Sequence, residues 1–157
     1  MRKMNAPIFQ NVGIIGLGPM GCGLAQNLIK HGIDVKAWEQ SPDVCNSVSH
    51  YFRENVLASS LNDLVASLSH PRCILLFLPN GQPIDDTIRQ LKVQLNPGDI
   101  IADCGNSYYK ETENRQKILR SSGISLIGVG VSGGPDGALS GPAIMAGGDV
   151  HSWNKIR

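Results

Sequence analysis

The sequence predicts an α/β fold of the Rossmann-like, doubly wound type, in which helices cover both faces of a mostly parallel sheet. Short apolar runs alternate along the chain with longer amphipathic stretches, as strands and crossover helices do. A glycine-rich turn over Gly16–Gly21 directly follows the first apolar run and opens the first helical stretch. The run Cys73–Leu78 is apolar throughout, which is typical of a strand covered on both faces.

Each expected element follows from its apolar spacing or from a capping signal. Apolar runs predict strands at residues 12–15, 34–38, 73–78, 99–102 and 124–129. Helical spacing predicts helices at residues 19–30, 83–95, 107–120 and 150–157, and two further helices begin at the signals Ser41-Pro42 and Ser60-x-x-Asp63. Asn106 or Ser107 is the N-cap candidate of the helix at 107–120, and Asp149 is that of the last helix.

Length and composition bound the class of protein. The 157 residues fit one dinucleotide-binding domain spanning 1–157. The net charge of +1 indicates that the chain does not bind nucleic acid. The absence of any long apolar run indicates that it does not bind a membrane. The four cysteines are too widely spaced for a zinc site or a disulfide framework, so we expect reduced thiols in a cytoplasmic protein that binds no metal.

The first glycine-rich turn matches the G-x-G-x-x-G pattern between a strand and a helix. Its six residues are expected to hold the cofactor: Gly16, Leu17, Gly18, Pro19, Met20 and Gly21. The first glycine permits the tight turn, the second lets the backbone approach a pyrophosphate, and the third allows close packing of helix against strand. The pyrophosphate then lies at the positive end of the helix.

The end of the second strand bears on the choice of dinucleotide. Glu39 lies close to the position where an acidic residue accepts hydrogen bonds from the ribose 2′-hydroxyl. The same carboxylate would repel a 2′-phosphate, and Gln40 and Ser41 provide no adjacent arginine to bind one. The cofactor is therefore NAD or NADP, with NAD favoured by Glu39.

A second glycine-rich region follows the last predicted strand. Asp103-Cys104-Gly105-Asn106-Ser107 ends a strand at the carboxyl edge of the sheet, where ligands bind in this fold. Residues 130–148 then contain most of the glycines of the second half, and clustered glycines expose N–H groups to an anionic or polyhydroxylated ligand. We expect residues 130–148 to form a substrate loop.

These motifs together resemble those of one enzyme family. The segments GLGPMG at 16–21, GDIIADCGNS at 98–107 and GVSGGPDGALSGPAIMAGG at 130–148 resemble the N-terminal domain of 6-phosphogluconate dehydrogenase, within the β-hydroxyacid dehydrogenase superfamily. The resemblance implies an NAD(P)-dependent oxidoreductase that oxidises 6-phosphogluconate and decarboxylates it to ribulose 5-phosphate. It implies a dinucleotide and a phosphorylated sugar acid as ligands, and a homodimer for the full-length enzyme.

The resemblance also implies roles for individual residues. The cofactor would be bound by the phosphate turn and, further along the chain, by Glu39, Gln40, Ser41, Leu78, Pro79, Asn80 and Asn106. The sugar acid would be bound by Asn106, Ser132, Gly133 and Gly134. Many family members have Asn-Arg-Thr where this chain has Glu39-Gln40-Ser41, which fits an NAD-preferring branch.

The resemblance places the acid/base lysine beyond Arg157, so we expect no catalytic residue in this chain. We likewise expect the all-helical C-terminal domain of the family to be absent from it. Without a positioned acceptor for the alcohol proton, the fragment is expected to bind cofactor without turnover. Since the family dimerises largely through the helical domain, a monomeric fragment is an open alternative.

Three other functions remain open from the sequence. The chain could be a non-catalytic nucleotide-sensing module, or a related β-hydroxyacid dehydrogenase with another substrate. A serine hydrolase is the third, because residues 130–134 also satisfy G-x-S-x-G around Ser132. A hydrolase needs an acid and then a histidine later in the chain, and only His151 follows.

Overall fold

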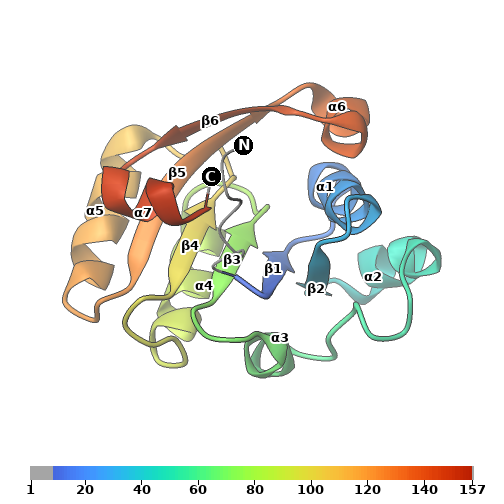
Figure 1. Cartoon of the computed structure of the whole chain (residues 1–157), viewed down its shortest axis with the longest axis horizontal. Coiled ribbons are helices and arrows are strands. Elements are labelled where there is room, and N and C mark those ends of the chain that lie inside the picture. Colours follow the sequence, from blue (N-terminus) through green and yellow to red (C-terminus); the bar gives the residue numbers. More distant parts are fainter. Residues whose placement is uncertain (1–8, 157) are drawn as a thin grey trace, which may run out of the picture.

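The apolar runs assemble into one six-stranded sheet (Figure 1). The computed structural model describes residues 9–156, and the strand order is β2-β1-β3-β4-β5-β6. The strands are β1 (Asn11–Ile15), β2 (Asp34–Trp38), β3 (Cys73–Leu76), β4 (Ile100–Asp103), β5 (Ser125–Ser132) and β6 (Ala143–Gly147). The pairings from β2 through β5 are parallel, and β6 pairs antiparallel with β5.

Five of the helices in the described residues begin at, or one residue from, a predicted position. The described helices are α1 (Pro19–Lys30), α2 (Pro42–Val48), α3 (Leu61–Ser67), α4 (Gln82–Lys92), α5 (Tyr109–Arg120), α6 (Gly134–Ser140) and α7 (Val150–Ile156), with a 3-10 turn at Ser49–Tyr51. Ser41, Ser60 and Asp149 each accept a backbone N–H of the first helical turn, as the capping signals predict. Arg157, at the end of the last predicted helix, lies outside the described residues.

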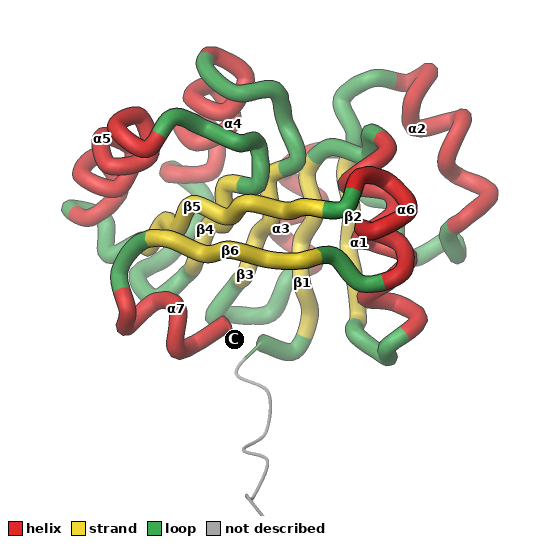
Figure 2. The backbone as a smooth tube through the Cα atoms, turned by 90° about the horizontal axis from the view of Figure 1, so that it is seen from above, coloured by secondary structure: helices red, strands yellow, loops and turns green. Residues whose placement is uncertain are grey.

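Consecutive residues of the central strands face opposite sides of the sheet, which explains why their sequences are apolar without alternation. Ile15 and Leu76 pack in the cluster that includes side chains of α3, α4 and α5. Their neighbours Ile14 and Leu75 belong to the cluster on the α1 side. Figure 2 shows α4 and α5 on one side of the sheet and α7 on the other. The doubly wound, mostly parallel fold is confirmed.

The region 130–148 differs from the loop that the sequence predicts. Strand β5 extends to Ser132, three residues further than expected, and its second half pairs with β6. Helix α6 lies between the two strands. The loop prediction was wrong because glycine is depleted in helices and strands, whereas here the pairing of β6 with β5 determines the local structure.

Smaller boundary differences occur elsewhere. Strand β3 ends at Leu76, two residues before the predicted end, so that Leu78 lies in the loop to α4. Helix α5 begins at Tyr109 with Tyr108 as its N-cap residue, and neither Asn106 nor Ser107 caps it. Over the described residues 9–156, no helix has the length and apolar character needed to cross a membrane.

Candidate functional site

The phosphate turn connects β1 to α1, and two of its glycines are required by close contacts. Gly16 has φ +93, and a Cβ there would lie 2.3 Å from the carbonyl oxygen of Phe77. A Cβ on Gly21 would lie 2.0 Å from the carbonyl oxygen of Gly16. A side chain at Gly16 would push the turn away from the segment that follows β3, and a side chain at Gly21 would push α1 away from the turn.

The middle of the turn is open instead. A Cβ built on Gly18 would meet nothing within 4 Å. Within residues 9–156, the N–H groups of Gly18 and Met20 have no hydrogen-bond partner, and Pro19 has no N–H. The turn therefore presents free donors at the N-terminus of α1, with open space beside Gly18, as a site for an anion requires.

Glu39 connects the end of β2 to this turn. Its Oε2 accepts the N–H of Leu17 at 2.7 Å, and its Oε1 accepts the N–H of Ser41 at 2.8 Å. The Leu17 side chain is buried in the core and its N–H is engaged by Glu39, so this residue contributes no free donor to the turn. Gln40 is exposed beside it. Because each carboxylate oxygen has two acceptor positions, Glu39 retains one on each oxygen.

The loops after β3 and β4 lie against each other at the carboxyl edge of the sheet. A Cβ on Gly105 would lie 2.5 Å from the carbonyl oxygen of Leu78, so these loops are in backbone contact. Pro79 and Asn80 are exposed at the tip of the first loop. Asn106 is exposed at the tip of the second, with φ +56, a left-handed conformation. The structure thus brings Leu78–Asn80 and Asn106 to neighbouring loops.

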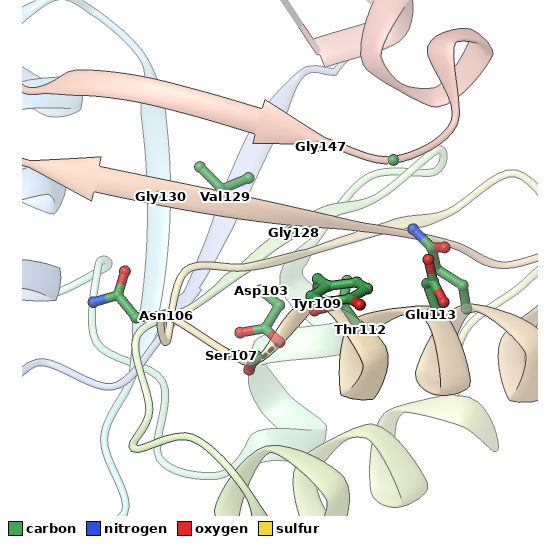
Figure 3. Close-up of a pocket in the computed structure, with 12 residues that line it drawn as sticks. Asp103, Asn106, Ser107, Tyr109, Thr112, Glu113, Gly128, Val129, Gly130 and Gly147 are labelled. Atoms are coloured by element: carbon green, nitrogen blue, oxygen red, sulfur yellow. Dashed lines mark hydrogen bonds between the residues drawn. The ribbon is translucent and has the colours of Figure 1, made fainter.

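A cleft of about 650 Å³ lies between α5 and the strands β5 and β6 (Figure 3). Of the predicted site residues, Asn106 lines it. The other lining residues are Asp103, Ser107, Tyr109, Thr112, Glu113, Gln116, Gly128, Val129, Gly130, Gly147 and Gly148. The sequence analysis did not single out Tyr109, Thr112 or Gln116. Their only signal is that they recur at helical spacing on the first turns of α5, directly after Asn106.

The predicted sugar-acid residues lie elsewhere. Ser132, Gly133 and Gly134 are exposed where β5 ends and α6 begins, outside the lining of the cleft. Helix α6 packs on α1, since a Cβ on Gly23 of α1 would lie 3.2 Å from the Cβ of Ala138. The turn at Ser132–Gly134 is therefore attached to the helix that the phosphate turn opens.

Asn27 strengthens the same helix contact. Its side-chain Nδ2 donates to the carbonyl oxygen of Leu139 at 2.7 Å, and Asn27 is buried.

In the described part of the chain, no histidine or carboxylate hydrogen-bonds to Ser132, so a hydrolase arrangement has no support. The described residues also contain no group of three or more metal-ligating side chains placed to hold a metal ion.

Cys104 of the Asp103–Ser107 segment lies in the core beneath the exposed edge. It is buried with Ala102, Ile127 and Val129. Burial, together with the nearby Asp103 charge, raises the pKa of the Cys104 thiol. The cysteine therefore packs in the core beneath the loop, whereas Asn106 two residues later is exposed.

The sheet order, the open phosphate turn and the carboxyl-edge loops define a dinucleotide-binding domain of the dehydrogenase class. The model of the NAD binding domain of 6-phosphogluconate dehydrogenase matches residues 11–157. The chain belongs to this family, as the resemblance of its motifs predicts.

Proteins with similar sequences are named 6-phosphogluconate dehydrogenases. The chain is 44% identical over 146 residues to a decarboxylating 6-phosphogluconate dehydrogenase of Chlamydia pneumoniae, covering 91% of this chain and 30% of that protein. It is 41% identical over 150 residues to the NAD(+)-dependent decarboxylating enzyme of Bacillus subtilis, covering 94% of this chain and 32% of the relative. The chain thus spans about a third of the length of these relatives.

Solved structures share the fold. A Plasmodium falciparum 6-phosphogluconate dehydrogenase, studied in its apo form and with NADP+ and 6-phosphogluconate, superposes with a TM-score of 0.80 at 26% identity, over 93% of this chain and 32% of that one. A Mycobacterium tuberculosis 3-hydroxyisobutyrate dehydrogenase gives a TM-score of 0.84 at 21% identity, over 96% of this chain and 50% of that one. The second similarity concerns the fold alone.

Proposed function

We propose that this chain is the cofactor-binding part of an NAD-preferring 6-phosphogluconate dehydrogenase. The proposal rests on the open phosphate turn, where the N–H groups of Gly18 and Met20 have no hydrogen-bond partner within residues 9–156 and the space beside Gly18 is empty. Both ends of the turn are closed by glycine contacts, so its geometry is set before a ligand arrives. A pyrophosphate fits this arrangement of donors.

The preference for NAD rests on Glu39. Its two N–H contacts hold the carboxylate beside the phosphate turn and leave acceptor positions for ribose hydroxyls. A 2′-phosphate at that place would meet a carboxylate at short range. Two unit charges about 4 Å apart repel by roughly 1 to 4 kcal/mol, depending on solvent exposure. We expect the chain to bind NAD at least about tenfold more tightly than NADP.

The remaining predicted residues would bind the reacting end of the ligands. Leu78, Pro79 and Asn80 would line the cofactor, and Asn106 would contact both the nicotinamide ribose and the sugar acid. When bound, the nicotinamide supplies a hydride acceptor for the substrate alcohol. This chain's residues bind and orient the two reactants, which brings the reacting atoms together.

Further features of the whole enzyme belong to the same proposal. Ser132, Gly133 and Gly134 would bind the carboxylate and hydroxyls of 6-phosphogluconate. The acid/base lysine would come from sequence beyond Arg157, so this chain alone would bind cofactor without turnover. The full-length enzyme would be a cytoplasmic homodimer.

Calorimetric titration of the chain with NAD and with NADP tests the proposal. The triple variant Glu39→Asn/Gln40→Arg/Ser41→Thr removes the carboxylate and adds a cation for a 2′-phosphate. We expect it to bind NADP more tightly than NAD. Ser41→Thr alone keeps the capping hydroxyl and is the matched control, with the preference for NAD unchanged.

Two results would contradict different parts of the proposal. Tighter binding of NADP than NAD by the unchanged chain would refute the role of Glu39. Binding of neither dinucleotide would refute the proposed cofactor site itself.

A further inference from the structure

Strand β4 has a buried aspartate at each end, and each aspartate pairs with a buried or nearly buried arginine. Asp99 precedes the strand and pairs with Arg72 at 3.1 Å. Asp103 is the last residue of the strand and pairs with Arg115 of α5 at 3.2 Å. The first pair lies at the amino edge of the sheet, and the second lies at the carboxyl edge, beneath the candidate site.

Arg115 joins three segments of the carboxyl edge. It is 3% exposed. Its Nη1 donates to Asp103 at 3.2 Å and to the Ser107 hydroxyl at 2.8 Å. Its Nε donates to Asp85 of α4 at 2.7 Å, and its Nη2 donates to the carbonyl oxygen of Gly81 at 3.3 Å. A planar guanidinium can make these bonds in fixed directions at once, which an ammonium cannot.

Asp103 in turn binds the residues on both sides of Asn106. Its Oδ1 accepts the N–H of Gly105 at 3.0 Å, and its Oδ2 accepts the Ser107 hydroxyl at 2.7 Å. Asn106 lies between them and is the only non-glycine residue with positive φ among residues 9–156. Such a conformation persists where the surroundings enforce it. Figure 3 shows the Asp103–Ser107 bond and the Asn106 side chain projecting from the turn.

We propose that Arg115 is a positioning residue that acts through Asp103 to present Asn106 to the nicotinamide end of the cofactor. Through Gly81, the same side chain holds the end of the loop that carries Leu78–Asn80. Arg115 itself is buried beneath the loops and does not line the cleft. This inference rests on the proposed function, because it assigns Arg115 to one half of that cofactor site.

A comparison of NAD with ADP distinguishes a positioning role of Arg115 from a merely structural one. ADP contains the adenosine and pyrophosphate that the phosphate turn and Glu39 would bind, and it lacks the nicotinamide half. The test is the affinity of the chain for NAD and for ADP, measured by calorimetry in Arg115→Lys. We expect NAD to bind about tenfold more weakly, the equivalent of one charge-assisted hydrogen bond, with ADP binding unchanged within about twofold.

Arg72→Lys is the matched control. It perturbs an equally buried carboxylate at the other end of β4, so we expect a comparable loss of thermal stability with no change in either affinity. If Arg115→Lys does not fold, Asp85→Asn is the second variant, because it changes a partner of Arg115 whose side chain is 45% exposed. The ratio of the NAD affinity to the ADP affinity is measured in the same way.

The possible results distinguish a failure of the positioning role of Arg115 from a failure of the proposed cofactor site. Equal loss of NAD and ADP binding in the Arg115 variant, or no loss of either, would overturn the positioning role. Failure of the unchanged chain to bind both NAD and ADP would overturn the proposed cofactor site instead.

Discussion

An added methyl group should destabilise the fold at Gly21 but not at Gly18, three residues earlier, while weakening NAD binding at both positions. At Gly21 the new Cβ would lie 2.0 Å from the carbonyl oxygen of Gly16, and a real contact needs more than 3 Å. The start of α1 must therefore move by about 1 Å or more, and overpacking of this kind costs about 1 to 3 kcal/mol. At Gly18 the Cβ meets nothing within 4 Å, and φ is −57.

Gly21→Ala should lower the melting temperature by roughly 2 to 12 °C, since 1 kcal/mol corresponds to roughly 2 to 4 °C for a chain of this size. It should also abolish measurable NAD binding. Gly18→Ala should keep the melting temperature within about 2 °C. If the pyrophosphate approaches the backbone at Gly18, the methyl group would block that approach, and NAD should bind at least about tenfold more weakly.

Thermal denaturation followed by circular dichroism, with calorimetric titration of NAD, measures both effects on the same samples. If Gly18→Ala bound NAD as tightly as the unchanged chain, the open face of the turn would not be where the pyrophosphate lies. If Gly21→Ala kept full stability, the close approach of α1 to Gly16 would not contribute to folding.

Two further predictions follow from buried groups. Burial raises the pKa of the Asp99 carboxyl, but hydrogen bonds from Asn96 and Arg72 outweigh it and hold the pKa below its usual value. Its contribution to stability is therefore complete above about pH 4 and is lost as the pH falls through the lower folded pKa. Asp99→Asn should destabilise the chain by roughly 3 kcal/mol at pH 7 and by progressively less below pH 4, measured by urea unfolding; a constant difference would contradict this. A disulfide reagent at neutral pH should modify Cys45 quickly and the three buried thiols only after denaturation, because burial raises the pKa of Cys73 to about 12 and also that of Cys104. Cys45→Ser should remove the fast phase, and its persistence would show that a buried thiol is accessible.

The sequence predicts the elements whose signals are local. Helix α1 runs from Pro19 to Lys30 as expected, because its proline start and its His31-Gly32 stop are encoded in adjacent residues. The strands β1 and β2 are predicted because each coincides with a short apolar run. The phosphate turn is also local, since its glycines, its strand and its helix occupy one continuous segment.

Features that depend on distant partners could not be predicted in this way. The short apolar run at Ala143–Gly147 lies among glycines, which predict a loop; it is a strand because it pairs with β5, although all five of its residues are exposed. Arg115 lies in a strongly polar helix, where the sequence gives no sign that this one charge is buried. Glu39 was expected to face a ribose, but its two backbone contacts became visible only in the structure.

The packing of α6 on α1 also constrains the order of folding. Asn27 and Leu139, which join the two helices, are 112 residues apart in the chain. Closing so long a loop is slow compared with forming the local β1–α1 turn. The phosphate turn can therefore form early during synthesis, whereas the helix that fastens the Ser132–Gly134 turn docks only after nearly the whole domain has been made. We therefore expect the two glycine-rich turns to form at different times during folding.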